Sequence, residues 1–122
     1  MTARTRNGPT RIALSGCGAV SELYYAPTLR ALAREGRIEV VALFDPDRGR
    51  RDALGAVFPL AARCNELAPV LDTRPQLLIV ASPPRFHADQ AIAALAGGID
   101  VLCEKPLAVS SADARRMTEA AT

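Results

Sequence analysis

The chain has 122 residues, of which 49% are hydrophobic and 23% are charged, and its net charge is +2. This composition is typical of one soluble globular domain and excludes a disordered chain, a collagen repeat and a disulfide-rich scaffold. No apolar run approaches the roughly 18–20 residues that cross a membrane. The small net charge and an aromatic content of 4% do not indicate a nucleic-acid partner.

The N-terminal segment and the cysteines indicate a cytoplasmic protein. Residues 1–10 are basic and polar and lack the apolar segment of a secretory signal, so we expect a flexible tail there and one domain over residues 11–122. Cys17, Cys64 and Cys103 are widely spaced and form no CxxC pair. Neither a disulfide framework nor a metal site is therefore expected.

In the first half of the chain, apolar runs of strand length alternate with segments of helical spacing. Pro27 lies inside the first helical segment, where it is expected to kink or restart the helix, and Gly36 is expected to cap its end. The predicted strands are residues 12–14, 38–44 and 60–64, and the predicted helices are residues 20–34, 47–57 and 66–71.

The second half continues this alternation. Ser82 followed by Pro83 and Pro84 is typical of a helix N-cap with prolines in the first turn, and Ser110 with Asp113 resembles a capping box. The predicted elements are strands at residues 77–80 and 99–103, a helix that ends at Gly97-Gly98, and a last helix up to Thr122. This alternation predicts an α/β fold with a doubly wound, mostly parallel sheet.

Residues 16–21 form a glycine-rich segment directly after the first predicted strand and read Gly-Cys-Gly-Ala-Val-Ser. Dinucleotide-binding turns need one glycine for the turn, a second for close approach to a pyrophosphate, and a third small residue for helix packing. Gly16 and Gly18 fill the first two positions, and Ser21 departs from the third but is small. The structural alternative is an ordinary glycine turn between a strand and a helix.

Asp45 ends the second predicted strand. In NAD-binding folds, an acidic residue about 20 positions after the glycine segment holds the adenosine ribose. The alternative is a cap for the helix that starts near Asp47. Arg48, with Arg50 and Arg51 nearby, would favour a 2′-phosphate that Asp45 would repel, so we expect NAD, with NADP as the other candidate.

Polar residues follow the two later strands, at the edge where open α/β sheets bind ligands. Ser82 follows the first of these strands, and His87 lies in the helix beyond it, where plain surface exposure is the alternative to a place near the ligand. Glu104 and Lys105 follow the second strand. Lys105 is the one lysine beside 14 arginines, which suits a site that needs an ammonium group, although chance is the alternative.

The segments GCGAVSELYYAPTL, LFDPDR and ASPPRFHADQAIAALAGGIDVLCEKPLA closely resemble the N-terminal domain of the Gfo/Idh/MocA oxidoreductases. The resemblance covers residues 11–122, and its most specific part is the EKP tripeptide at residues 104–106. It implies a Rossmann-type domain that binds a nicotinamide dinucleotide and carries Lys105 as the catalytic lysine. The cofactor-binding residues expected on this basis, with their neighbours, are Gly16, Cys17, Gly18, Ala19, Val20, Asp45, Arg48, Ala81, Ser82, Pro83, His87, Glu104, Lys105 and Pro106.

The resemblance also implies parts that this chain lacks. Members of the family have one more strand in the first domain and a C-terminal domain that supplies the substrate pocket and the usual dimer interface. The chain ends inside the helix after the EKP tripeptide, so we expect an incomplete first domain that is inactive alone. The complete enzyme would transfer a hydride between the cofactor and a hydroxyl carbon of a small polyhydroxy substrate, a sugar or cyclitol, and it could form a homo-oligomer.

Two other classes of protein share the glycine turn and the acidic strand end. One is a non-catalytic, nucleotide-sensing module of the same fold, which turnover by a complete protein would exclude. The other is a Rossmann-type methyltransferase, which would bind S-adenosylmethionine instead of a dinucleotide. The EKP tripeptide argues against the methyltransferase.

Overall fold

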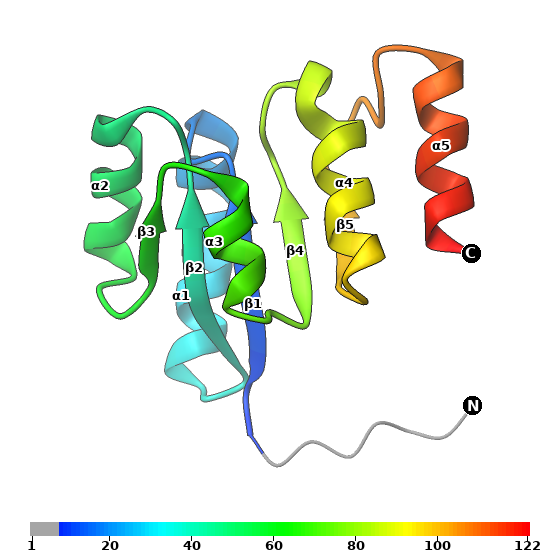
Figure 1. The fold of residues 1–122 in the computed structure, drawn as a ribbon. Coiled ribbons are helices and arrows are strands. Elements are labelled where there is room, and N and C mark those ends of the chain that lie inside the picture. Colours follow the sequence, from blue (N-terminus) through cyan, green and yellow to red (C-terminus); the bar gives the residue numbers. More distant parts are fainter. Residues whose placement is uncertain (1–7) are drawn as a thin grey trace.

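The computed structural model describes residues 8–122, and these residues form one five-stranded sheet (Figure 1). All neighbouring strands are parallel, in the order β3-β2-β1-β4-β5. The chain therefore reverses direction across the sheet between β1 and β4, as expected of a doubly wound fold. The strands are β1 (Thr10–Ser15), β2 (Ile38–Phe44), β3 (Ala62–Cys64), β4 (Leu77–Val80) and β5 (Asp100–Cys103).

Helices alternate with these strands along the chain and cover both faces of the sheet (Figure 1). None of the helices in residues 8–122 is long and apolar enough to cross a membrane. The helices are η1 (Ser21–Tyr25), α1 (Ala26–Arg34), α2 (Arg48–Val57), α3 (Leu67–Asp72), η2 (Pro84–Phe86), α4 (His87–Ala96) and α5 (Ser111–Ala121).

The core forms because successive strand residues point to opposite faces. Ile12 and Leu14 of β1 pack with α1 and α2 on one face, whereas Ala13 packs with α3 and α4 on the other. Helix α5 packs beside α4 through Met117, in a smaller apolar cluster. Residues 12–15 of β1 are buried, and this strand lies at the centre of the sheet.

The boundaries differ from the predicted ones in a few places. The expected tail covers residues 1–10, of which residues 1–7 lie outside the described residues. The expected end of the tail is wrong, because Thr10 already pairs with Ile38 in the sheet. The first helical segment begins with a π-helical turn, in which the N–H of Ala26 donates to the carbonyl of Ser21. The regular helix α1 then starts with Pro27 in its first turn, so the predicted restart at this proline is confirmed.

The predicted N-cap at Ser82 is wrong. Helix α4 begins at His87, after a 3-10 turn over Pro84–Phe86, and the Ser82 side chain caps neither of the two helices. The Ser82 hydroxyl donates instead to the side-chain oxygen of Gln90, one of the buried polar groups on α4. The predicted cap at Ser110 is confirmed, because its hydroxyl accepts a hydrogen bond from the N–H of Asp113.

Candidate functional site

The glycine turn packs directly against the segment that follows β4. Gly16 has a φ of +95°, and a Cβ atom on it would lie 2.6 Å from backbone atoms of Ala81 and Ser82. Its N–H donates to the carbonyl of Phe44 at the end of β2, with a distance of 2.8 Å. Glycine is therefore required at this position, and the turn joins the carboxyl ends of β1, β2 and β4.

The second half of the turn is open. A Cβ atom on Gly18 would meet no atom within 4 Å. Among the described residues, no group accepts a hydrogen bond from the N–H of Gly18, Ala19 or Val20, since the first helical bond is made by the N–H of Glu22. Free N–H groups at a helix start, next to open space, are the arrangement that binds a phosphate anion.

Ser21, which departs from the expected glycine or alanine, is fully buried, and its hydroxyl donates to the carbonyl of Gly16. The Ser21 side chain therefore links the end of the glycine-rich segment to its first residue. This bond satisfies a carbonyl that the tight turn leaves without a partner in the sheet.

Asp45 fixes the same turn from the end of β2. Its side chain is 5% exposed, and its two oxygens accept the N–H groups of Cys17 and Asp47 at 2.9 and 2.8 Å. The alternative in which Asp45 caps the next helix is wrong, because Asp47 caps α2 through the N–H groups of Gly49 and Arg50. Each carboxylate oxygen has a second lone pair, which leaves Asp45 able to accept a hydroxyl group.

A cleft of about 430 Å³ opens beside these residues. Arg48 does not line it, because its exposed side chain pairs with Asp52 along α2 at 3.6 Å. Arg50, which the sequence did not single out over its neighbours, lines the cleft instead. The cleft is lined by residues that include Gly16, Asp45, Arg50, Ser82, Phe86 and Gln90.

His87 is buried, so the alternative of a plain surface residue is wrong. Its side chain is 1% exposed, and both ring nitrogens face backbone carbonyls. Nδ1 lies 2.9 Å from the oxygen of Pro106, and Nε2 lies 2.6 Å from the oxygen of Ser82. The imidazole therefore holds the segment after β5 against the segment after β4.

The segment after β5 is also tied to the glycine-turn helix. The hydroxyl of Tyr25 donates to a carboxylate oxygen of Glu104 at 2.5 Å, across 79 residues of sequence. This bond, with the N–H of Lys105 as a second donor, lowers the pKa of the Glu104 carboxyl, while burial and the same bond raise the pKa of Tyr25 to about 12. Lys105 itself is exposed, and its ammonium group forms no ion pair with residues 8–122.

Two contributors to this site, Tyr25 and Gln90, were not among the residues predicted from the sequence. Tyr25 falls on the predicted apolar spacing of the first helix, and Gln90 interrupts the apolar spacing of the fourth. A polar residue at a buried helical position is the signal that could have identified Gln90. Tyr25 carries no comparable signal, because its partner lies on a distant strand end.

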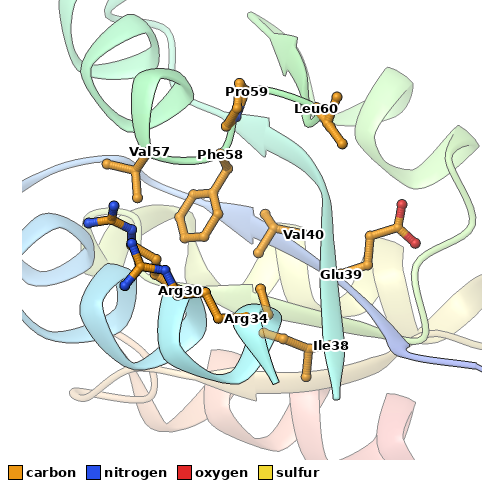
Figure 2. Close-up of a pocket in the computed structure, with 10 residues that line it drawn as sticks. Arg30, Arg34, Ile38, Glu39, Val40, Val57, Phe58, Pro59 and Leu60 are labelled. Atoms are coloured by element: carbon orange, nitrogen blue, oxygen red, sulfur yellow. The ribbon is translucent and has the colours of Figure 1, made fainter. Parts of the chain in front are cut away.

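A second cavity of about 430 Å³ lies near the amino-terminal end of β2, away from the carboxyl ends of the strands (Figure 2). It is formed by the end of α1, the start of β2 and the segment after α2. Because ligands of open α/β sheets bind at the carboxyl ends of the strands, this cavity is not the candidate site. Its lining includes Arg30, Arg34, Ile38, Val57, Phe58 and Leu60, and none of the residues predicted for the site.

The strand order, the glycine turn at the point where the sheet reverses, and the cleft beside Asp45 define a dinucleotide-binding domain of the Rossmann type. The model of the Gfo/Idh/MocA family, described as an oxidoreductase family with an NAD-binding Rossmann fold, matches residues 10–122. The chain belongs to this family. The resemblance inferred from the sequence is thereby confirmed.

Similar proteins support the same assignment. The D-glucoside 3-dehydrogenase of Escherichia coli is 30% identical over 99% of this chain, and the inositol 2-dehydrogenase of Leifsonia xyli is 33% identical over 89% of it. The WlbA dehydrogenase of Chromobacterium violaceum, solved with NADH and UDP-GlcNAcA, is 26% identical and covers 99% of the chain with a TM-score of 0.90.

The 3-ketoreductase KijD10 of Actinomadura kijaniata, solved with NADP, is also 26% identical, covers 93% of the chain and has a TM-score of 0.80. The chain spans about a third of the length of these relatives: 34% of the glucoside dehydrogenase, 31% of the inositol dehydrogenase and 34% of each of the two solved enzymes.

Proposed function

We propose that this chain is the NAD-binding part of an oxidoreductase that transfers a hydride between the nicotinamide and a hydroxyl carbon of a sugar or cyclitol. The observation that carries the proposal is the open face of the glycine turn at Gly18, beside the cleft that Asp45 lines. The relatives named for glucosides and inositol support the substrate class. When bound, the nicotinamide ring supplies the hydride chemistry.

Each residue of the site has a separate task in this proposal. The N–H groups of Gly18, Ala19 and Val20 bind the pyrophosphate, and Asp45 accepts a ribose hydroxyl. Lys105 moves the proton of the substrate hydroxyl, a task that fits its exposed and unpaired ammonium group in the described part of the chain. Proton transfer by a positioned side chain contributes roughly 10²–10⁴-fold to the rate.

The cofactor assignment is tested by calorimetric titration of the folded chain with NAD and NADP. We expect NAD to bind more tightly, because the Asp45 carboxylate accepts from a ribose 2′-hydroxyl and repels a 2′-phosphate. Asp45→Asn should narrow the difference, since it removes the charge but keeps one oxygen for the N–H of Cys17 or Asp47. Thermal unfolding of this variant controls for loss of the turn, and equal affinities in the unsubstituted chain contradict the assignment.

The catalytic assignment is tested in a version that includes the substrate domain. Lys105→Arg keeps the positive charge but should abolish most turnover, because a guanidinium is not deprotonated in proteins. NAD affinity should change much less than turnover. Substantial turnover by this variant would remove Lys105 from the proton-transfer step.

The 122-residue chain should bind NAD without oxidising a panel of polyols and sugars, as followed by NADH absorbance.

A further inference from the structure

Gln90 is the most unusual polar residue of α4. It is 9% exposed, and the other buried residues of the helix are His87 and the alanines Ala88, Ala91 and Ala94. Burial of an amide in such surroundings costs free energy unless its oxygen and nitrogen are both satisfied. The partners of the two ends of this amide therefore indicate what the residue does.

The oxygen end is fully used. The hydroxyls of Ser15, at the end of β1, and Ser82, after β4, each donate to Oε1 of Gln90 at 2.7 Å. Neither hydroxyl donates to any other described residue, and a carbonyl oxygen offers two lone pairs for two donors. These bonds fix the rotation of the amide group from both sides of the point where the sheet reverses.

The nitrogen end is free. Nε2 of Gln90 makes no hydrogen bond to residues 8–122, yet no buried side-chain nitrogen or oxygen in this part of the chain is without a partner. The amide nitrogen must therefore belong to the small exposed fraction of the side chain. Gln90 lines the cleft together with Gly16 and Asp45, so this exposed fraction faces the cleft.

We propose that Gln90 is a hydrogen-bond donor of the dinucleotide site, with Nε2 directed to an oxygen of the bound cofactor. The inference rests on the proposed function. Ser82 is expected among the cofactor-binding residues, and its hydroxyl donates to Gln90. Ser15 and Ser82 position the amide, and Gln90 makes the contact. The donor is held rigidly before the cofactor arrives, which limits the entropy lost on binding.

The decisive variant is Gln90→Glu. A glutamate keeps an oxygen for the hydroxyls of Ser15 and Ser82 but replaces the donor Nε2 with a charged acceptor. We expect the dissociation constant for NAD, measured by calorimetry, to rise at least about tenfold, while thermal unfolding still shows a folded domain. Gln76→Glu is the matched control, because Gln76 lies just before the amino-terminal end of β4, away from the cleft. This variant should bind NAD as tightly as the unsubstituted chain.

A second variant and a direct measurement protect the test against misfolding. Gln90→Met removes the donor without adding a charge, and it should also weaken NAD binding. In the unsubstituted chain, the side-chain amide protons of Gln90 should shift in NMR spectra when NAD is added, whereas those of Gln76 should not. The chain has only these two glutamines, and the amide signal that is absent from Gln90→Met identifies Gln90.

The outcomes separate this inference from the proposed function. The donor role alone is overturned if the unsubstituted chain binds NAD and either Gln90 variant binds it with unchanged affinity. It is also overturned if the Gln90 amide signal does not move when NAD binds. Failure of the unsubstituted chain to bind NAD overturns the proposed function and the donor role with it. Weakened binding in the Gln90 variants together with a shifted amide signal supports both.

Discussion

Gly16 and Gly18 are only two residues apart, but glycine occupies the two positions for different physical reasons. Gly16 is required by the fold, since its φ is positive and a Cβ atom would overlap the backbone of Ala81 and Ser82. Gly18 is not required by any contact among the described residues, because a Cβ atom there would meet open space. Its small size therefore matters for what approaches the turn from outside.

Alanine at each of these positions should separate folding from binding. Gly16→Ala should lower the free energy of unfolding by about 2–4 kcal/mol, from the strained backbone and the overlap with Ala81. Gly18→Ala should leave that free energy within about 1 kcal/mol but weaken NAD binding at least about tenfold. Urea unfolding and calorimetric titration measure the two effects, and a Gly18→Ala variant that binds NAD normally contradicts the open-turn argument.

The Cys17 thiol makes stability depend on alkaline pH. Burial, and then the charge of Asp45, raise the pKa of this thiol from 9.0 to about 12, although Arg51 acts in the opposite direction. A thiol with a raised pKa in the folded chain contributes stability that is present below pH 9 and is lost as the pH rises towards 12, because only the unfolded chain ionises readily in this range.

Cys17→Ala should remove this pH dependence. The free energy of unfolding of the unsubstituted chain should fall faster between pH 8 and pH 10 than that of the variant, as measured by urea unfolding under reducing conditions. Parallel curves for the two proteins would show that Cys17 ionises as easily in the folded chain as in the unfolded one.

At the scale of elements, the segment after β5 is attached to its neighbours by side chains. Tyr25 at the end of η1 binds Glu104, and His87 at the start of α4 lies against the carbonyl of Pro106. Both contacts join elements that are distant in sequence. Together they hold the segment that carries Lys105 against the end of η1 and the start of α4.

Tyr25→Phe should release one of these attachments without changing the shape of the side chain. The pKa of the Glu104 carboxyl, which the Tyr25 hydroxyl lowers most, should rise towards its ordinary value of 4.5 in an NMR titration. A lowered carboxyl pKa contributes stability that is present above pH 4.5 and lost as the pH falls below it. The destabilisation of Tyr25→Phe should therefore be larger at neutral pH than in acid.

Tyr24→Phe is the matched control for this experiment. Tyr24 is the adjacent residue, and its side chain is 71% exposed. Its hydroxyl forms no side-chain hydrogen bond with the rest of residues 8–122. An equal change of the Glu104 pKa in both variants would mean that the Tyr25 hydroxyl is not the cause.

At the scale of the whole molecule, the sheet of residues 8–122 ends at β5, which has one paired edge and one unpaired edge. An unpaired strand edge offers N–H and carbonyl groups to another chain. Apolar side chains are exposed on and after this strand, namely Leu102, Leu107 and Val109. The 122-residue chain therefore has a surface that favours self-association.

Sedimentation velocity over a range of concentrations should show reversible association of this chain. Leu102→Lys places a charge on β5, at a side chain that is 47% exposed, and should shift the distribution towards monomer without loss of NAD binding. A chain that stays monomeric at every concentration would contradict the prediction.

The sequence by itself determined the order of strands and helices, the glycine turn and the acidic strand end. These features depend on local patterns: apolar runs of strand length, helical spacing, and glycine where the backbone needs a positive φ. For the same reason, the sequence was misleading at Ser82. A serine before two prolines has the local pattern of a helix cap, but in the fold a buried amide eight residues away accepts its hydrogen bond.

Only the tertiary structure decided how the site residues are held. Asp45 accepts a hydrogen bond from the glycine turn, 28 residues away in sequence. The hydrogen bond between Tyr25 and Glu104 spans 79 residues, and the one between Ser15 and Gln90 spans 75. Such pairs form because parallel strands bring their carboxyl ends to one edge of the sheet, whatever their separation in sequence. No local pattern encodes these distances. Hence the residues of the motif could be read from the sequence, whereas the partners that fix them required the fold.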